Sequence, residues 1–542
     1  MHPNGYIPAP CFSGGLKTYW GLIYKFTSPL LREPDRKLIC MNFNSVNYMI
    51  FLPIVVMGRF AVPKKFKNTY LLFVSYYFYF CAESRFFLLL PFLTAITWFM
   101  GILLDRAEKN RGGIFCLALA LNLGTLIFFK YNKFFLNIFQ DITGIGYVRE
   151  NWFLPMGLSF YTFMAVSYLA DIYLKKYRRC DNLRDFAVYI SFFPHVLMGP
   201  IDRRDKFLPQ LKEERKFDYD RFRRALQLMA LGFFKKIAVA DMLAKFIDRV
   251  HLDLYSYTGA MLIFTAVMYS FQLYADFSGY CDIARASGMM LGFDLAENFS
   301  TPYLSTSFSQ FWSRWHITLS NWFQDYIFTP VVWTNPFKKL PVIGKFFEKP
   351  PVLPAVAMVF IASGIWHGST WNFVIWGLCH AVYRIGEELM RRYYKKPDKH
   401  PRPLKFWGKV VWVFSLVTFS QIFFRSKDIP AALYYIAQVF TNVNPSAFIS
   451  QYFAAVGAGF DYTPILIYGY SAFCALTLGI MIYMDFVRCF RLKGKCLTNR
   501  LDGLKPVVRW VCYWGLIGLI MAGFIMNNGG FGASASFIYN GF

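Results

Sequence analysis

The chain has 542 residues, of which 56% are hydrophobic, 20% aromatic and only 17% charged, and its formal net charge is +26. This composition excludes an ordinary soluble domain, which carries more charge and fewer aromatic residues. The positive charge lies in short gaps between apolar runs, with no separate basic helix or basic-aromatic platform, and this argues against nucleic-acid binding.

Residues 1–40 are rich in glycine and proline and lack the apolar core and small-residue cleavage site of a signal peptide. We expect them to form a poorly ordered N-terminal extension. A strong apolar run follows Met41 almost at once. We therefore expect residues 41–542 to form a single transmembrane domain.

Apolar segments recur along the rest of the chain, and about 20 such residues cross a bilayer. The hydropathy pattern predicts an all-α polytopic membrane protein with roughly ten to twelve spans. The segments lie near residues 46–62, 69–82, 86–104, 113–129, 152–174, 225–247, 257–275, 352–366, 371–390, 408–424, 462–486 and 507–526.

Basic gaps between the apolar runs indicate the cytoplasmic side. Two of them, near residues 175–184 and 203–224, are separated only by residues 186–201. A spanning segment there would place one strongly basic gap outside. The segment is also short and is interrupted by Pro194, Gly199 and Pro200. We predict that it enters and leaves on the same side, covered by protein.

Residues 305–335 are aromatic, yet they carry polar side chains that lipid would not accept, so we expect them to face a cavity. Pro302 and Pro330 are expected to bound the segment as helix breakers. At helical spacing Trp312, His316 and Ser320 would share one face. The polar residues are Gln310, Arg314, His316, Asn321, Gln324 and Asp325.

His367 follows Trp366 at the end of another apolar run and stands between Gly364 and Gly368, which allow close backbone approach. A histidine at membrane depth is costly, which favours a functional role. A buried imidazole tends to stay neutral and can accept a proton, so His367 is a candidate general base. The alternative is a core histidine bonded to a backbone carbonyl.

His316 follows Trp315 and is a candidate second active-site group that orients donor or acceptor; the alternative is a structural bond to a neighbour such as Ser320. No metal is expected, since no third ligand stands at metal-site spacing. His380 is interpreted as structural and His195 as ambiguous.

Asp276 lies in an apolar run and needs a partner. A structural hydrogen bond or ion pair is the favoured role, with lining of a channel second. The eleven cysteines include no C-x-x-C pair, so neither a zinc site nor a disulfide framework is indicated.

These stretches together resemble the membrane-bound O-acyltransferase (MBOAT) family, in its bacterial branch that O-acetylates exported polysaccharides. The likeness covers nearly everything from Met41 onward. His195 departs from it, standing where relatives usually have glutamine, and residues 1–40 have no counterpart. The motifs that carry the likeness are Phe129–Phe135, Gly157–Phe163, Ser167–Asp171, Phe192–Pro194, Gly199–Ile201, Gly232–Lys236, Asp276, Glu297–Phe299, Pro302–Tyr303, Phe311–His316, Trp366–Gly368 and Phe537–Tyr539.

The resemblance implies a ring of tilted helices and re-entrant segments around a central tunnel in the cytoplasmic (inner) membrane of a bacterium. It maps the family's near-invariant histidine to His367 and the second polar position to His316. Acetyl-CoA would be the donor, and an SGNH-type acetyltransferase on the outer face the partner. Candidate residues lining the tunnel are Gln310, Trp312, Arg314, Asn321, Asp276 and Trp366.

Two alternatives stay open. The enzyme could instead use a D-alanyl carrier protein and modify teichoic acid. A transporter or flippase for an anionic or acylated substrate would also carry polar islands within its spans. Such a transporter would not consume acetyl-CoA.

Overall fold

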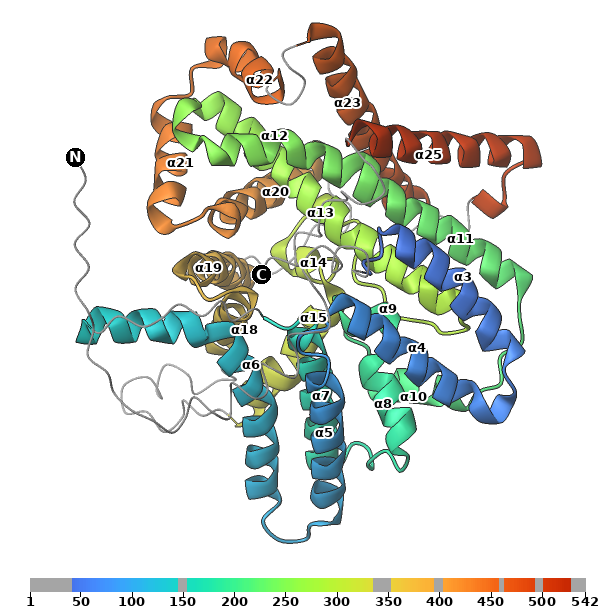
Figure 1. Ribbon diagram of the computed structural model, residues 1–542. Helices are drawn as coiled ribbons and strands as arrows, with labels where there is room; N and C mark the ends of the chain where they lie inside the picture. Colours follow the sequence, from blue (N-terminus) through green and yellow to red (C-terminus); the bar gives the residue numbers. More distant parts are fainter. Residues whose placement is uncertain are drawn as a thin grey trace, which may run out of the picture.

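A computed structural model describes residues 41–144, 154–334, 352–393, 403–457, 463–492 and 501–527. Every regular element within these ranges is a helix (Figure 1), which confirms the all-α prediction. The expected extension over residues 1–40 and the motif Phe537–Tyr539 lie outside the described residues.

Six of the described helices are long and apolar enough to cross a membrane, fewer than the expected ten to twelve. The difference arises because α3 (Val46–Ala61), α4 (Lys67–Ala82), α7 (Leu158–Tyr173) and α18 (Val352–His367) have 16 residues each. Sixteen residues rise only about 24 Å, against a hydrocarbon core of about 30 Å. The six long helices are α5 (Leu89–Arg106), α6 (Arg111–Thr143), α13 (Gly259–Met290), α20 (Pro403–Arg425), α23 (Pro464–Phe486) and α25 (Pro506–Met526).

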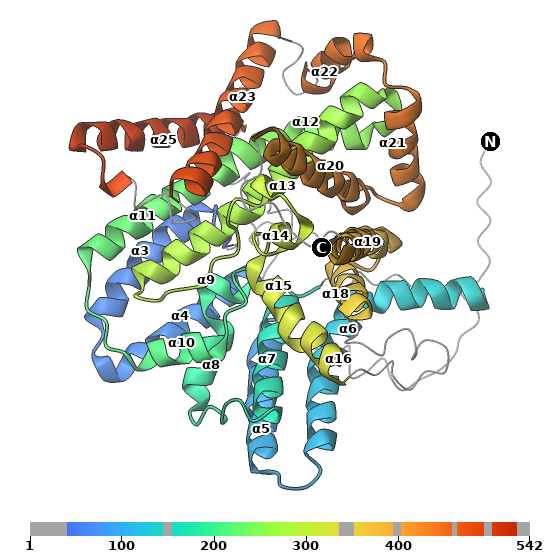
Figure 2. The ribbon, with the colours of Figure 1, turned by 180° about the vertical axis from the view of Figure 1, so that it is seen from behind.

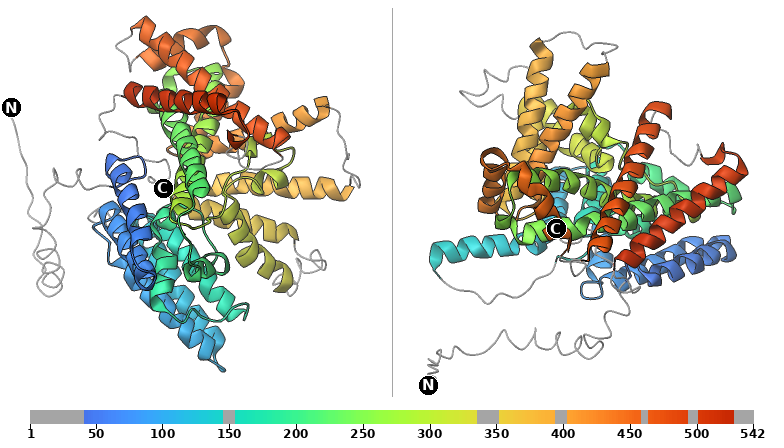
Figure 3. Two further views of the ribbon diagram at one scale, coloured as in Figure 1. Left: turned by 90° about the vertical axis from the view of Figure 1, so that its right-hand side faces the viewer. Right: turned by 90° about the horizontal axis from the view of Figure 1, so that it is seen from above.

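Helix α13 is the central element, and it packs along α11 (Tyr219–Phe233) over much of its length (Figures 1 and 3). The two helices approach closely at a pair of glycines. A Cβ on Gly232 would lie 2.8 Å from the carbonyl oxygen of Gly279, and a Cβ on Gly279 would lie 2.8 Å from that of Gly232. Only glycine fits such a contact.

The chain continues from α11 through a π-helical turn, Phe234–Ala240, into α12 (Asp241–Leu252). Helices α7, α13, α18, α19 (Trp371–Tyr393) and α20 surround two short helices at the centre of the molecule, as Figures 1 and 2 show from opposite sides. These short helices are α14 (Phe308–Trp312) and α15 (Ile317–Phe323). Most of the polar residues that were expected to face a cavity, from Gln310 to Asn321, therefore lie on elements in the middle of the molecule.

The segment between the two basic gaps folds back on itself, and its predicted re-entrant placement in the membrane stays a prediction. The segment consists of α8 (Leu183–Ser191) and the single turn α9 (Phe193–Val196), both too short to span a membrane. Directly afterwards Arg204 donates a hydrogen bond to the Arg178 carbonyl and lies 5.4 Å from the centre of the Tyr177 ring. The two ends of the segment, at Arg178 and Arg204, therefore lie side by side.

His195 holds this folded segment together, which settles its ambiguous role as a structural one. Its side chain is fully buried. Nδ1 lies 3.2 Å from Oδ2 of Asp202, and Nε2 lies 2.8 Å from the carbonyl oxygen of Tyr189. The other carboxylate oxygen of Asp202 accepts a hydrogen bond from the Ala296 amide at 3.0 Å.

Replacing His195 with leucine is expected to destabilise the protein by about 3 kcal/mol, because Asp202 would remain buried after losing its partner. His195→Gln keeps a polar amide at the same place and should cost much less. Thermal unfolding of the two variants in detergent compares them. Equal melting temperatures for the two variants would contradict this role of His195.

The expectation that Trp312, His316 and Ser320 share one helical face is wrong. Helix α14 ends at Trp312, and His316 adopts a left-handed conformation with φ of 42° before α15 begins. The physical reason is a contact from outside the segment. Asn298 accepts hydrogen bonds from the backbone amides of Ile317 and Thr318, which takes these groups out of a continuous helix.

Pro330 does not end this segment, contrary to expectation. It is the second residue of α16 (Thr329–Thr334), which follows a π-helical turn, Gln324–Phe328, without a break. Pro302 does lie before the segment, in the short 3₁₀ helix Pro302–Leu304.

Candidate active site

His367 is the last residue of α18 and is buried among aromatic rings. The centre of its ring lies 4.8 Å from those of Trp366 and Trp376 and 5.2 Å from that of Phe424. Helix α19 passes close by, because a Cβ on Gly364 would lie only 2.4 Å from the Phe373 carbonyl oxygen. The predicted close backbone approach beside His367 is therefore confirmed.

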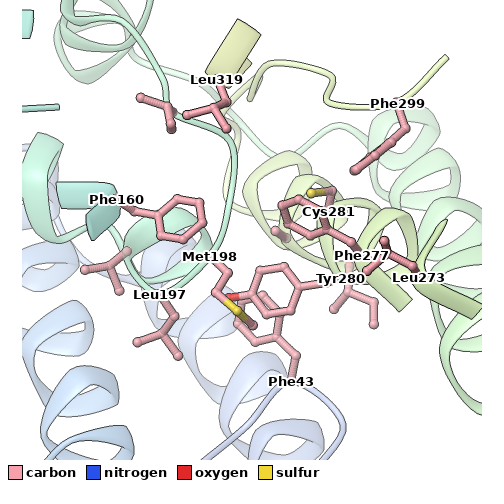
Figure 4. Close-up of a cluster of buried hydrophobic side chains, with 14 of the residues drawn as sticks. Phe43, Phe160, Leu197, Met198, Leu273, Phe277, Tyr280, Cys281, Phe299 and Leu319 are labelled. Carbon is pink, nitrogen blue, oxygen red and sulfur yellow. The ribbon is translucent and has the colours of Figure 1, made fainter. Parts of the chain in front are cut away.

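His316 lies in a second aromatic environment, only 1% exposed. Its ring is 4.8 Å from that of Phe277 and 6.4 Å from that of Phe160 (Figure 4 shows both phenylalanines). Neither ring nitrogen has a hydrogen-bond partner among the described residues. A buried polar group without a partner costs free energy, as does a left-handed backbone at a residue other than glycine. Such costs are typical of functional positions.

Trp366 connects the two histidines. Its ring centre lies 6.3 Å from that of His316 and 4.8 Å from that of His367. Phe160 also contacts both Trp366, at 5.8 Å, and His316. The two histidine motifs, far apart in the sequence, therefore meet in one aromatic cluster.

A narrow cavity opens beside His367, with a volume of about 20 Å³. This is enough for about one water molecule. The cavity lies between α13, α14, α19 and α20. Its walls are formed by Leu273, Phe311, Trp312, Trp315, His367, Trp376, His380, Val417, Gln421 and Phe424.

Of the residues expected to line a tunnel, Trp312 lines this cavity and Trp366 contacts both histidines. The side-chain oxygen of Gln310 instead accepts hydrogen bonds from the amide and hydroxyl of Thr306. Gln310 thus fixes the local turn and does not line this cavity.

Arg314 and Asn321 also lie away from the cavity walls. Arg314 donates long hydrogen bonds, of 3.5 and 3.4 Å, to the carbonyls of Thr301 and Leu304. Asn321 is exposed on the surface of the protein chain.

Asp276 forms an ion pair, the role favoured for it from the sequence. One carboxylate oxygen lies 2.7 Å from Nζ of Lys236, which also contacts Asp241 at 2.8 Å. All three side chains are buried. This cluster joins α13 to the π-helical turn and is separate from the cavity beside His367.

Lys130 and Tyr131 on α6 also contact the site, although the sequence analysis did not predict this. Lys130 donates a hydrogen bond to the Trp366 carbonyl, and its Nζ lies 5.3 Å from the centre of the Trp366 ring. Tyr131 donates to the Ile365 carbonyl. Both bonds satisfy carbonyls at the end of α18, where a positive charge is also favoured. A lysine inside an apolar run was the signal available in the sequence.

His380, interpreted as structural, is also part of the site, because it lines the same cavity as His367. Its ring centre lies 4.8 Å from that of Trp376 and 5.0 Å from that of Trp312. Among the described residues, no group of three or more histidine, cysteine, aspartate or glutamate side chains is placed to hold a metal ion.

The helices long and apolar enough to cross a membrane indicate a polytopic membrane protein, and comparison with known proteins gives its class. Residues 178–426 match the model of the MBOAT, membrane-bound O-acyltransferase family. The probable alginate O-acetylase AlgI of Azotobacter vinelandii is 31% identical over 453 residues, which cover 81% of this chain and 87% of the relative. The chain therefore belongs to the MBOAT family and is a multi-pass membrane acyltransferase.

Other relatives place it within the family. The peptidoglycan O-acetyltransferase of Helicobacter pylori is 29% identical over 435 residues, covering 73% of this chain and 79% of the relative. The teichoic acid D-alanyltransferase of Bacillus subtilis is 27% identical over 341 residues, covering 60% of this chain and 81% of the relative. The likeness to the O-acetylating relatives is stronger and extends over more of the chain.

Replacing Lys130 with methionine is expected to lower the acyl-transfer rate by about 10- to 100-fold, because small displacements of a reacting group are costly. The Trp366 carbonyl would lose its donor, and the end of α18 would no longer be held. Lys130→Arg keeps the donor and the charge and should retain most of the rate. Initial rates of both variants at saturating donor give the comparison; equal losses would argue against this positioning role.

Proposed function

We propose that this enzyme moves acetyl groups from cytoplasmic acetyl-CoA across the membrane for O-acetylation of an exported or cell-wall polysaccharide, with His367 as the general base. It acts in the bacterial cytoplasmic membrane, as one domain over residues 41–542. An SGNH-type acetyltransferase on the outer face is the expected partner that carries the acetyl group to the polymer.

The observation that carries this proposal is the meeting of His367 and His316 at Trp366, in a chain that belongs to an O-acyltransferase family. His367 faces a cavity whose walls are mostly aromatic side chains, with no lysine, arginine, aspartate or glutamate among the lining residues. A neutral imidazole in such a place can act as a base.

In the proposed reaction, His367 takes the proton of the acceptor hydroxyl while the hydroxyl oxygen attacks the thioester carbonyl. The new carbon–oxygen bond forms, the carbon–sulfur bond breaks, and the coenzyme A thiolate leaves. The thiolate then takes up the proton from the His367 imidazolium, which restores the neutral base. His316, whose ring nitrogens have no partner among the described residues, would orient the donor or the acceptor.

The cavity beside His367 is too small, in this conformation, for any acyl thioester. About 20 Å³ beside His367 admits no long acyl chain, and the cavity must widen even for an acetyl thioester. The walls are large aromatic residues such as Trp376 and Phe424.

The relatives favour one of the two acyl donors under consideration. The alginate and peptidoglycan O-acetylating proteins match 81% and 73% of this chain, whereas the D-alanyltransferase of Bacillus subtilis matches 60%. This difference favours acetyl-CoA over a D-alanyl carrier protein.

Incubating the purified full-length chain in nanodiscs with labelled acetyl-CoA tests the donor. We expect release of free coenzyme A and, when the SGNH-type partner and an alginate oligosaccharide are added, labelled acetyl ester on that oligosaccharide. A parallel reaction with D-alanyl carrier protein should give no transfer. Transfer from the carrier protein and not from acetyl-CoA would make the chain a D-alanyltransferase, and turnover of neither would leave transport as the function to test.

A further inference from the structure

Two residues that line the cavity beside His367 each have a buried polar atom that lacks a partner among the described residues. The atoms are Nε1 of Trp312, on α14, and Nδ1 of His380, on α19. The two ring centres lie 5.0 Å apart with their planes at 80°. His380 is 1% exposed, so its free nitrogen is not satisfied by bulk water. A buried polar atom of this kind indicates a bound polar group.

Ser420 on α20 determines which hydrogen-bonding role His380 offers to the cavity. Its hydroxyl donates to the Val417 carbonyl at 2.7 Å, and its oxygen lies 2.9 Å from Nε2 of His380. A hydroxyl has one hydrogen to donate. The arrangement that satisfies both contacts has the hydroxyl donating to the Val417 carbonyl, which can only accept, and Nε2–H of His380 donating to the Ser420 oxygen. The hydrogen-bond network thus assigns Nδ1 of neutral His380 as an acceptor.

Trp312 offers the complementary role, because the indole N–H is a donor only. The cavity therefore has one donor and one acceptor, and its volume suits about one water-sized group. A hydroxyl group fits this pair, since it accepts one hydrogen bond and donates another. A carbonyl group could use only Trp312.

We propose that Trp312 and His380 form the binding site for the hydroxyl group of the acceptor and present it to His367. Trp376 lies between the two histidines, with its ring centre 4.8 Å from each. Ser420 is a positioning residue that keeps the proton of His380 away from the cavity. This inference rests on the proposed O-acyl transfer and adds the residues that recognise its second substrate.

The first test does not depend on the acyl donor. High-resolution cryo-electron microscopy of the full-length protein in nanodiscs, with water as the only small hydroxyl probe, should show one ordered water between Trp312 Nε1 and His380 Nδ1. Trp312→Phe keeps the ring and removes the donor, so the density should disappear. A cavity that is empty in the wild type would overturn the proposal.

The second test uses two substitutions of His380, each of which places an amide group near a different one of the two imidazole nitrogens. His380→Gln can still reach Ser420 but removes the acceptor at Nδ1, whereas His380→Asn places an amide oxygen near Nδ1. Transfer to an alginate oligosaccharide should show an acceptor KM at least tenfold higher for His380→Gln than for His380→Asn. The KM for acetyl-CoA should stay unchanged in both. A purely structural His380 predicts the opposite order, because the bond to Ser420 would then matter most.

Ser420→Ala gives a milder check that preserves the packing. It should raise the acceptor KM severalfold with little change in the melting temperature. His251→Gln removes a partly buried histidine outside the cavity and serves as the control with unchanged kinetics. If the wild type does not use acetyl-CoA, the proposed function fails, while the water density still decides whether the hydroxyl site exists.

Discussion

Replacing His367 with alanine is expected to reduce acetyl transfer by about 10³-fold, because general base catalysis contributes between about 10² and 10⁴. His367 stands at the cavity with its ring held between Trp366 and Trp376. Initial rates of coenzyme A release, measured with the purified variant at saturating donor, give the size of the loss.

His316→Ala is the informative comparison for this experiment. His316 contacts Trp366 but does not line the cavity, so its loss should reduce the rate by less than the loss of His367. Both variants should unfold at temperatures close to that of the wild type. A His367→Ala enzyme that retains most of its rate would remove His367 from the reaction and leave His316 as the candidate base.

The largest expected effect on stability comes from Lys236→Met. Lys236 is the shared cation of Asp241 and Asp276, and all three side chains are buried. Its removal would place two carboxylates close together without that cation, at a cost of about 3–5 kcal/mol. The variant should show a much lower melting temperature and a lower yield from the membrane.

A compensating variant separates this electrostatic effect from lost packing. Lys236→Met combined with Asp241→Asn and Asp276→Asn removes all three charges, and replacing a complete buried ion cluster is often nearly neutral. The triple variant should therefore regain much of the stability. If it unfolds as readily as Lys236→Met alone, the cost lies in packing around the π-helical turn.

The helical membrane fold and the histidine pair were predictable, because both depend on local composition. Long apolar runs indicate spans directly, and a histidine within such a run is conspicuous because its burial is costly. The return of the chain between the basic gaps was predictable from charge, since the gaps around Arg184 and Arg203 were expected on the same side.

The break at His316 could not be predicted from helical periodicity. It depends on Asn298, which reaches the amides of Ile317 and Thr318 from outside the segment. The lengths of the apolar helices were not predictable for a related reason: an apolar window does not reveal where a helix such as α7 ends. Tertiary contacts and loop positions set these boundaries.

The role of His380 also depends on contacts between distant elements. In the sequence it is one histidine in an apolar run, which is more often structural. Only the fold places His380 on the other side of Trp376 from His367, and only the fold brings Ser420 within hydrogen-bond distance of His380 Nε2. Lys130 is a similar case, because its partner at Trp366 lies 236 positions away.

The central claim is that an acetyl group passes from coenzyme A on one face of the membrane to a hydroxyl on the other. Proteoliposomes test this transfer when they hold the protein in one orientation, with labelled acetyl-CoA outside and an alginate oligosaccharide and the SGNH-type partner trapped inside. Labelled acetyl ester should appear inside the vesicles with the wild type and be absent with His367→Ala. Coenzyme A release without labelled product inside, or equal labelling by His367→Ala, would contradict it.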